Sequence, residues 1–415
     1  MAIIEADSCS AEHVAAAIAD ASNGDTLVVP AGSETWTDYV QCSKSLDFVG
    51  AGIDVTTIGR YGLLFNSGTD DWSVTGFTFD NQAYGNNNIQ GIRVSDKIYT
   101  GPGCFAAGSK RFRIHHNKFK NFYNPAPPTT YNYFVIRMNG YCYGVIDNNI
   151  FYDCLGEVIY YAADNGPAWT RGGGLGGYEN GTMFVEDNQY STSGLHGWMY
   201  NPIDSASGAR YVFRYNSIED AVDAPLITCC ECHGLCNNDS DNADVRGTYS
   251  VEIYGNIITK HDAESGECFK VRGGRGVICN NVLLTVGAGS FGTYQIRLQE
   301  HRAEPALYGA CYDCGACEPV NPRTYAPDTE LYPAHDQINN LYIWGNTKDG
   351  GALSAIYVDG QIAYRPAPND DLQYVEEGID YFESEMGGYT PYAYPHPLRG
   401  YGGGEVGKVV MVLLS

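Results

Sequence analysis

Asparagine residues recur along the chain, each with an apolar residue three positions before it. In six of these seven units the residue two positions after the asparagine is also apolar. This spacing fits a strand, a turn at the asparagine and a second strand. Residues five and three positions before the asparagine then point inward, and those four and two before it point outward. The pairs are Ile114 and Asn117, Ile146 and Asn149, Val185 and Asn188, Phe213 and Asn216, Ile253 and Asn256, Ile278 and Asn281, and Ile343 and Asn346.

A repeat of this kind predicts a parallel β-helix, a solenoid in which every coil extends one continuous core. The distances between successive asparagines exceed a minimal coil, so we expect the surplus residues to form loops at the turns. An asparagine side chain bonds nearby backbone at a turn, and asparagines stacked coil on coil can bond each other. We therefore expect the seven asparagines to form one column on strands about 4.8 Å apart.

Helical spacing occurs only near the beginning of the chain. Ser10 suits an N-cap, Gly24 ends the pattern, and the apolar positions between them are Val14, Ala17, Ile18 and Ala21. We expect residues 1–35, this helix and the first strand, to cap the open end of the core. Residues 36–400 are predicted to form the β-helix, with loop insertions near 229–247 and 301–335.

Residues 401–415 contain a glycine hinge followed by an apolar run. The run is β-prone and does not alternate, so both of its faces favour burial. It either packs as a last strand on its own stack or pairs with a neighbouring subunit. We expect the second arrangement, and with it an oligomeric assembly.

Composition excludes several classes of protein. The chain of 415 residues is 44% hydrophobic and 18% charged, which is untypical of a disordered or coiled-coil protein. Its net charge of −24 argues against a broad basic face for nucleic acid. The longest apolar run is too short to span a membrane. The first five residues lack the regions of a signal peptide, so we expect a processed chain or release without a signal, as from a virus.

Fourteen cysteines are present, and an even number permits full pairing in an oxidising compartment. We expect most of them to form disulfides. The candidates flank repeat units or lie in two cysteine-dense loops, and they are Cys142, Cys154, Cys268, Cys279, Cys229, Cys236, Cys311 and Cys317. Zinc is an alternative in the loops, but adjacent Cys229 and Cys230 fit the usual zinc spacing poorly, so no metal site is predicted.

Three segments resemble known β-helix proteins. The run Asp25 to Gly32, followed by Val49-Gly50-Ala51-Gly52, resembles the opening of pectate-lyase-like β-helices. Arg210 to Asn281 is similar to the right-handed parallel β-helix repeat proteins of environmental bacteria and phages, and Tyr389 to Leu398 is similar to their closing motif. The resemblance implies an all-β, right-handed parallel β-helix, here with a short N-terminal capping helix and long cysteine-rich loop insertions.

Strand alternation places several scarce basic residues and some aromatic ones on the outside of the coils. Such a row could bind an acidic polysaccharide, or it could be a solvated face that pairs with acidic residues. The glycan-binding candidates are Arg137, Arg214, Tyr254, Lys270, Arg272, Arg297 and Trp344.

Arg272-Gly273 resembles the Arg-His-Gly signature of alginate and chondroitin lyases, with Gly273 in place of the histidine. Leu226-Ile227-Thr228 stands where those lyases carry a catalytic lysine. Arg272, Lys270 and His233 are therefore the candidates for catalysis, but strong lyase activity is not expected.

These observations favour an extracellular structural or adhesive β-helix that contacts glycans. A virion appendage (a tail or capsid fibre) or a surface filament subunit would fit, assembled with other subunits through its C-terminal strand. The alternative is a secreted polysaccharide lyase or hydrolase acting on acidic glycans. No cofactor is expected, although a lyase could use Ca²⁺.

Overall fold

The computed structural model describes residues 1–82, 89–94, 108–123, 134–163, 173–178, 181–194, 199, 201–233, 247–263, 266–299, 338–353, 356–359 and 375–400. In this part of the chain one α-helix, α1 (Ala11–Asp20), is followed by strands in three long sheets. No helix among these residues is long and apolar enough to cross a membrane.

The three sheets are named here sheet 1, sheet 2 and sheet 3. In spatial order, sheet 1 contains β1 (Ile3–Glu5), β2 (Thr26–Val29), β5 (Asp47–Gly50), β8 (Ser73–Thr75), β11 (Lys110–His115), β14 (Tyr143–Asp147), β17 (Thr182–Glu186), β20 (Arg210–Arg214), β23 (Ser250–Tyr254), β26 (Gly274–Cys279), β29 (Ile338–Trp344) and β33 (Tyr381–Phe382). Sheet 2 contains β3 (Gly32–Trp36), β6 (Thr56–Arg60), β9 (Thr78–Asp80), β12 (Lys118–Phe122), β15 (Ile150–Cys154), β18 (Gln189–Ser191), β21 (Ser217–Glu219), β24 (Ile257–Lys260), β27 (Val282–Thr285), β30 (Thr347–Lys348) and β31 (Gly351–Ala352). Sheet 3 contains β4 (Val40–Cys42), β7 (Leu63–Phe65), β10 (Ile92–Val94), β13 (Ile136–Asn139), β16 (Glu157–Ala162), β19 (Asn201–Ala206), β22 (Cys230–Cys232), β25 (Phe269–Val271), β28 (Ile296–Gln299) and β32 (Ile356–Asp359).

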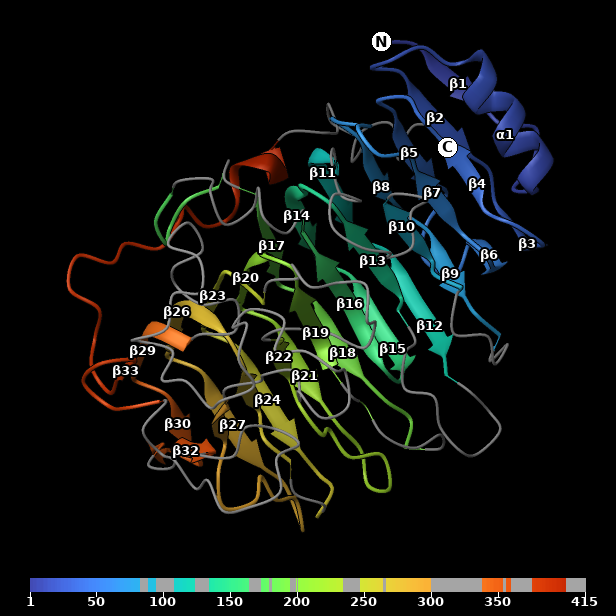
Figure 1. The fold of residues 1–415 in the computed structure, drawn as a ribbon. Helices are drawn as coiled ribbons and strands as arrows, with labels where there is room; N and C mark the ends of the chain where they lie inside the picture. Colours follow the sequence, from blue (N-terminus) through green and yellow to red (C-terminus); the bar gives the residue numbers. More distant parts are fainter. Residues whose placement is uncertain are drawn as a thin grey trace, which may run out of the picture.

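Successive strands pass from sheet 1 to sheet 2 to sheet 3 and then return to sheet 1. Each strand therefore pairs in parallel with the strand one coil later, as β11 does with β14 and β12 with β15. Only the short β30–β31 pair is antiparallel among the described pairs. The protein is a right-handed parallel β-helix, as the asparagine repeat predicted (Figure 1).

The seven asparagines form one continuous ladder at the turn between sheets 1 and 2. Each side-chain amide donates to the side-chain oxygen of the asparagine in the next coil, over N–O distances of 2.9 to 3.2 Å from Asn117 to Asn346. The same oxygen accepts a backbone N–H, as Asn216 Oδ1 does from Asn188. Because all seven are buried, these bonds satisfy polar groups that would otherwise be costly to bury. The predicted column is confirmed.

Inward side chains stack in register through the core. On sheet 2 the rings of Phe79, Phe119, Phe151 and Tyr190 follow one another with centroids 5.1, 5.1 and 4.7 Å apart. These are the residues two positions after the asparagines, or their equivalents, and they point into the core. Stacked aromatic rings add to the hydrophobic burial between neighbouring coils.

The helix α1 lies at the N-terminal end of the stack, beside β1, β2 and β4 (Figure 1). Ser10 is its N-cap, as predicted, and its side chain accepts a hydrogen bond from the backbone N–H of His13 at 3.3 Å. Val14, Ala17 and Ile18 are buried on one side of the helix. Their spacing is the amphipathic pattern that predicted this element.

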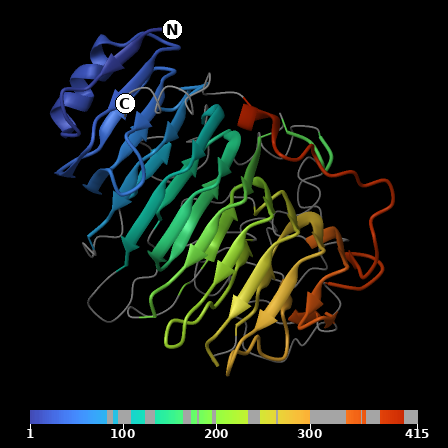
Figure 2. The ribbon, with the colours of Figure 1, turned by 180° about the vertical axis from the view of Figure 1, so that it is seen from behind.

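A C-terminal segment, residues 389–400, runs back along the outer face of sheet 1. We call it the strap, and Figures 1 and 2 show it in red, passing the edges of the coils and ending in a turn near β11 and β14. Tyr392 and Leu398 of the strap pack on a small outer cluster that includes Val145, Phe184 and Val212. The strap therefore covers outward-pointing apolar residues that sheet 1 would otherwise expose.

The described cysteines contradict the prediction of disulfides. Cys9, Cys42, Cys142, Cys154, Cys229, Cys230, Cys232, Cys268 and Cys279 are all buried free thiols. Cys142 precedes a strand of sheet 1 and donates to the carbonyl of Asn139, whereas Cys154 ends a strand of sheet 2 and donates to that of Phe119.

The candidates that flank another repeat unit, Cys268 and Cys279, also form no disulfide. Cys268 belongs to the inner core, and Cys279 belongs to the outer cluster under the strap. Cys268 precedes β25 of sheet 3 and Cys279 ends β26 of sheet 1, so residues close in sequence lie on different sheets and face different sides. Cys236, Cys311 and Cys317 lie outside the described residues, as do the predicted insertion at 301–335, most of the one near 229–247 and the predicted strand within 401–415.

Candidate functional site

One outward residue from each of eight successive strands of sheet 3, from β10 to β32, forms a row across the coils. We call these residues the sheet 3 row. In cross-strand register they are Arg93, Arg137, Tyr160, Asp204, Glu231, Lys270, Arg297 and Tyr357. Each lies between two inward residues of its own strand, as Lys270 lies between Phe269 and Val271, so strand alternation turns its side chain outward.

The two ends of the row combine cations with aromatic rings. The guanidinium carbon of Arg137 lies 5.0 Å from the centroid of Phe134 and 5.8 Å from that of Tyr160. At the other end Tyr294 and Tyr357 stack at 4.6 Å, and Arg297 lies 5.9 Å from the Tyr357 ring. Tyr294 and Tyr357 are 43% and 37% exposed. Exposed rings beside guanidinium groups offer both apolar faces and bidentate donors to a ligand.

The middle of the row is acidic. Glu157, Asp204, Glu231 and His233 form what we call the acidic cluster. His233 Nε2 lies 3.0 Å from Asp204 Oδ2, and Asn201 Nδ2 donates to Glu231 Oε2 at 2.9 Å. Asp204 is fully buried and Glu231 nearly so, whereas Glu157 is partly exposed. Carboxylates at this depth need partners, because burying an unpaired charge is costly.

Two cations next to the cluster are those partners. Lys270 Nζ lies 3.3 Å from Glu231 Oε1, and the Arg272 guanidinium forms an ion pair with the same oxygen. Arg272 Nη2 also lies 3.1 Å from His233 Nε2. A negative charge on Glu231 is thus stabilised from two sides.

Glu157 differs from the other carboxylates in its protonation. Removal from water, the charge of Asp204 and a hydrogen bond to Asp204 raise the pKa of Glu157 to about 8, although His233 and Arg272 act in the opposite direction. Glu157 therefore binds a proton more readily than an exposed glutamate does.

The ligand atoms of Asp204, Glu231 and His233 lie within 4.8 Å of one another, which is compatible with a metal ion. Two carboxylates and an imidazole would suit Mn²⁺ or Zn²⁺. However, Arg272 already contacts both Glu231 and His233, and Lys270 adds a second positive charge. The chain's own cations neutralise this cluster, and we assign no metal to it.

The structure brings together five of the residues that the sequence singled out. His233, Lys270 and Arg272, the candidates for catalysis, lie in or beside the acidic cluster, and Arg137 and Arg297 lie in the same row. The remaining candidates, Arg214, Tyr254 and Trp344, are on sheet 1.

Two of the sheet 1 candidates cannot contact a glycan in this structure. Arg214 is fully buried, and its guanidinium donates to the carbonyls of Tyr392 and Ala393 in the strap. Tyr254 is 5% exposed and accepts from Arg214 through its hydroxyl. Both point outward, as predicted, but the strap covers them. Trp344 is partly buried at the edge of the same cluster.

Sequence reasoning missed the carboxylates of the cluster. Acidic residues outnumber basic ones by 49 to 25, so no pair of them stood out. The signal that could have found Asp204 and Glu231 is a polar residue between two inward ones, once in every coil, as in Ile203-Asp204-Ser205 and Cys230-Glu231-Cys232.

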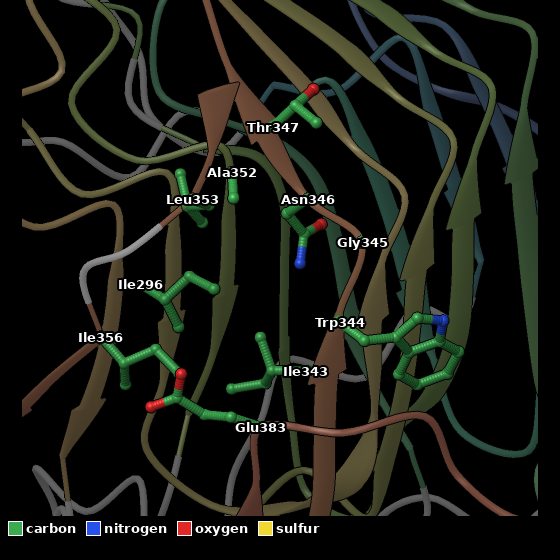
Figure 3. Close-up of a pocket in the computed structure, with 10 residues that line it drawn as sticks. All are labelled: Ile296, Ile343, Trp344, Gly345, Asn346, Thr347, Ala352, Leu353, Ile356 and Glu383. Carbon is green, nitrogen blue, oxygen red and sulfur yellow. The ribbon is translucent and has the colours of Figure 1, made fainter. Parts of the chain in front are cut away.

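A separate cavity of about 360 Å³ lies within the last described coils. Figure 3 shows Ile296, Ile343 and Ile356 pointing toward one another across it, with the indole of Trp344 turned away. Among the described residues that line it, Glu383 is the one titratable side chain. This cavity is open to solvent and lined mainly by apolar side chains, so the polar and charged groups are concentrated on sheet 3 instead.

No protein-family model matches the sequence, and no curated protein matches it. Among solved structures the chain is similar to the Dettilon tailspike protein, with 12% identity and a TM-score of 0.32 over 84% of this chain. The chain spans 64% of the length of that tailspike. The fold assignment rests on the strand pairing and not on this similarity.

Proposed function

We propose that the protein binds an acidic glycan along the outer face of sheet 3. The observation that carries this proposal is the sheet 3 row, in which guanidinium groups and aromatic rings lie on both sides of a polar centre, and the rings at one end are exposed. A sugar ring offers an apolar face to tyrosine and phenylalanine, and a uronate or sulfate group offers an anion to arginine and lysine.

The distribution of charge supports an acidic ligand. The molecule has a net charge of −24, so it repels a polyanion over most of its surface. Five of its 25 Lys and Arg residues lie on this one face, namely Arg93, Arg137, Lys270, Arg272 and Arg297. The middle of the row is acidic and pairs with Lys270 and Arg272, so a polyanion would be attracted to the arginines at the two ends of the row.

Binding can be measured with polygalacturonate, alginate and chondroitin sulfate by calorimetry at two salt concentrations. We expect binding of at least one polymer, weakened by salt because the contacts are ionic. Arg93→Ala and Arg297→Ala, which change two partly exposed arginines of the row, should each weaken it about tenfold or more, since a charged hydrogen bond contributes roughly 1.5–3 kcal/mol. Lys118→Ala, which removes an exposed ion pair with Asp54 on sheet 2, is the matched control. No binding to any polymer, or equal effects of all three substitutions, would overturn the proposal.

The wider role that we propose is that of an extracellular or virion-surface protein, a subunit of an appendage or filament. A rigid stack of coils with a flat binding face suits attachment to a surface polysaccharide. Assembly through residues 406–414 is part of this proposal. Deletion of residues 405–415 should then give folded monomers in light scattering, and unchanged assembly would contradict it.

A further inference from the structure

We propose that the end of the coil stack at β29 and β32, which we call the open end, binds the apolar run 406–414 of a second copy as an added strand on the edge of β32. This inference rests on the assembly through residues 406–414 in the proposed function, and it names the surface that receives the run. The contact is head-to-tail, because the run of one copy meets the open end of the next.

The edge of β32 is the first observation that supports this surface. β32 is the last strand of sheet 3 and pairs with β28 on one side, and no described strand pairs with its other edge. Its inward residues Ile356 and Val358 are partly exposed. Their neighbours on β28, Ile296 and Leu298, are fully buried. A strand edge with uncovered apolar side chains favours the addition of another strand.

The cavity of about 360 Å³ lies beside this edge. Figure 3 shows Ile356 at its border, with Ile296 and Ile343 facing it. Asn346, the last asparagine of the ladder, also lines the cavity, and it donates to the carbonyl of Ile278 but to no further asparagine in the described part of the chain. A strand laid over the cavity would bring apolar side chains to the isoleucines and a backbone carbonyl to Asn346.

The run 406–414 cannot lie along β32 of its own chain. The strap ends at Gly400, beside β11 and β14. Five strand spacings, about 24 Å, separate β14 from β29, and β32 lies farther away, on another sheet of the same coil. The six residue steps from Gly400 to Val406 cover at most about 22 Å. The run of a second copy is not limited in this way.

The chemistry of the run suits the open end. Seven of its nine residues are apolar, and Lys408 is its one charged residue. Glu383 lines the cavity, and burial together with the negative charge of Glu377 raises the pKa of Glu383. Both glutamates are exposed, so a lysine that arrives from another copy can pair with them.

The test is a complementation assay with two variants that each lose one half of the contact. Deletion of residues 405–415 removes the run, and Ile356→Asp places a charge at the open end. We expect each variant to be monomeric in sedimentation at concentrations where the full chain assembles. An equimolar mixture should form a one-to-one dimer, because one variant keeps the run and the other keeps the open end. Val222→Asp, at an exposed apolar residue between β21 and β22, is the control and should assemble like the full chain.

A charge reversal tests the same contact at exposed positions. Lys408→Glu should weaken assembly about tenfold or more, because it brings like charges together at Glu383. Adding Glu383→Lys to the same chain should restore assembly, since residue 408 of one copy meets residue 383 of the next. Lys408→Arg keeps the charge and should assemble like the full chain.

Three results would overturn the inference. If the deletion gives monomers but Ile356→Asp assembles like the control, the run pairs elsewhere and the proposed assembly still stands. If the mixture stays monomeric while thermal melts show both variants folded, another segment covers β32, such as residues 360–374 of the same chain. If the deletion variant assembles as before, both this inference and the proposed assembly fail. Where Ile356→Asp is unfolded, unchanged assembly of Lys408→Glu overturns the inference.

Discussion

The ion pair between Arg214 and Glu186 offers the most direct test of how the strap is held on sheet 1. Both side chains are fully buried, and Arg214 Nη2 lies 2.6 Å from Glu186 Oε2. Arg214→Met keeps the length of the side chain and removes its charge. The substitution leaves Glu186 with Arg399 alone as a cationic partner and deprives two strap carbonyls of their donors.

The expected cost follows from these contacts. Removing one partner of a buried pair costs about 3–5 kcal/mol, because the other charge stays buried. Glu186→Gln should cost less, since its amide keeps the shape of the carboxylate and Arg214 keeps the strap carbonyls. The double variant should be less destabilised than the sum of the two single ones. We expect a coupling energy of roughly 1–3 kcal/mol.

Two assays read out this cycle. Guanidinium unfolding midpoints give the change in stability, and hydrogen exchange of residues 389–400 reports local release of the strap. Arg111→Met, whose exposed guanidinium pairs with Asp71, is the control and should cost little. If Arg214→Met changes stability no more than Arg111→Met, or if the two single effects simply add, the strap is not held by this pair.

Three further predictions concern the ladder, the thiols and pH. Asn216→Ala should lower the free energy of unfolding by about 3 kcal/mol, because it leaves the buried side-chain amide of Asn188 and the carbonyl of Val185 without these hydrogen bonds. Ser217→Ala is the control and should change the free energy of unfolding little. Equal denaturation midpoints for the two variants would contradict this. Thiol titration of the protein unfolded without reductant should find at least nine reactive thiols, and fewer would show disulfides among the described cysteines. Burial and the charge of Arg214 lower the pKa of His396 to about 3, so its contribution to stability is present above the unfolded value of 6.5 and is lost as pH falls toward 3. His396→Phe should therefore flatten the fall in melting temperature between about pH 7 and 5, and an unchanged slope would refute that role.

The architecture could be predicted because one local rule repeats in every coil. An inward residue such as Phe213, a turn asparagine such as Asn216 and an inward Ile218 require the same backbone path each time. The ladder then connects coils whose loops differ in length. The lengths of the loops follow no such rule. The sequence therefore could not show which outward residues of successive coils lie next to each other on sheet 1 or on sheet 3.

The prediction that most cysteines form disulfides was wrong for the described cysteines, because closeness in sequence was taken as closeness in space. In a three-sheet coil a few residues suffice to change sheet or side, as between Cys142 and Cys154. Each described thiol is instead buried as a small apolar group, and burial raises the pKa of Cys154 and Cys268 well above the usual value. Thiols in such surroundings are unreactive.

The candidate site could be predicted only in part. Alternation alone placed Lys270 and Arg272 outward, and both lie beside the acidic cluster. Glu157 was missed because its interaction with Asp204 joins two coils, and that neighbour is set by strand register, which a stretch of single sequence does not reveal. The shift in the pKa of Glu157 arises from the same contact between coils.

Outward charged residues are covered on sheet 1, whereas several on sheet 3 remain partly accessible. The residues that lie between the charges determine which of the two occurs. On sheet 1 the charged Glu186 and Arg214 alternate with outward Phe184 and Val212, whose apolar surface favours a cover, and the strap covers it. Once covered, the charges must pair with each other and with the strap, and they become structural. On sheet 3 the positions around Asp204 and Glu231 are polar, and the rings at one end of the row are exposed. Apolar residues at successive outward positions thus indicate a covered face, whereas a polar row with exposed rings at its end indicates a face kept for a ligand.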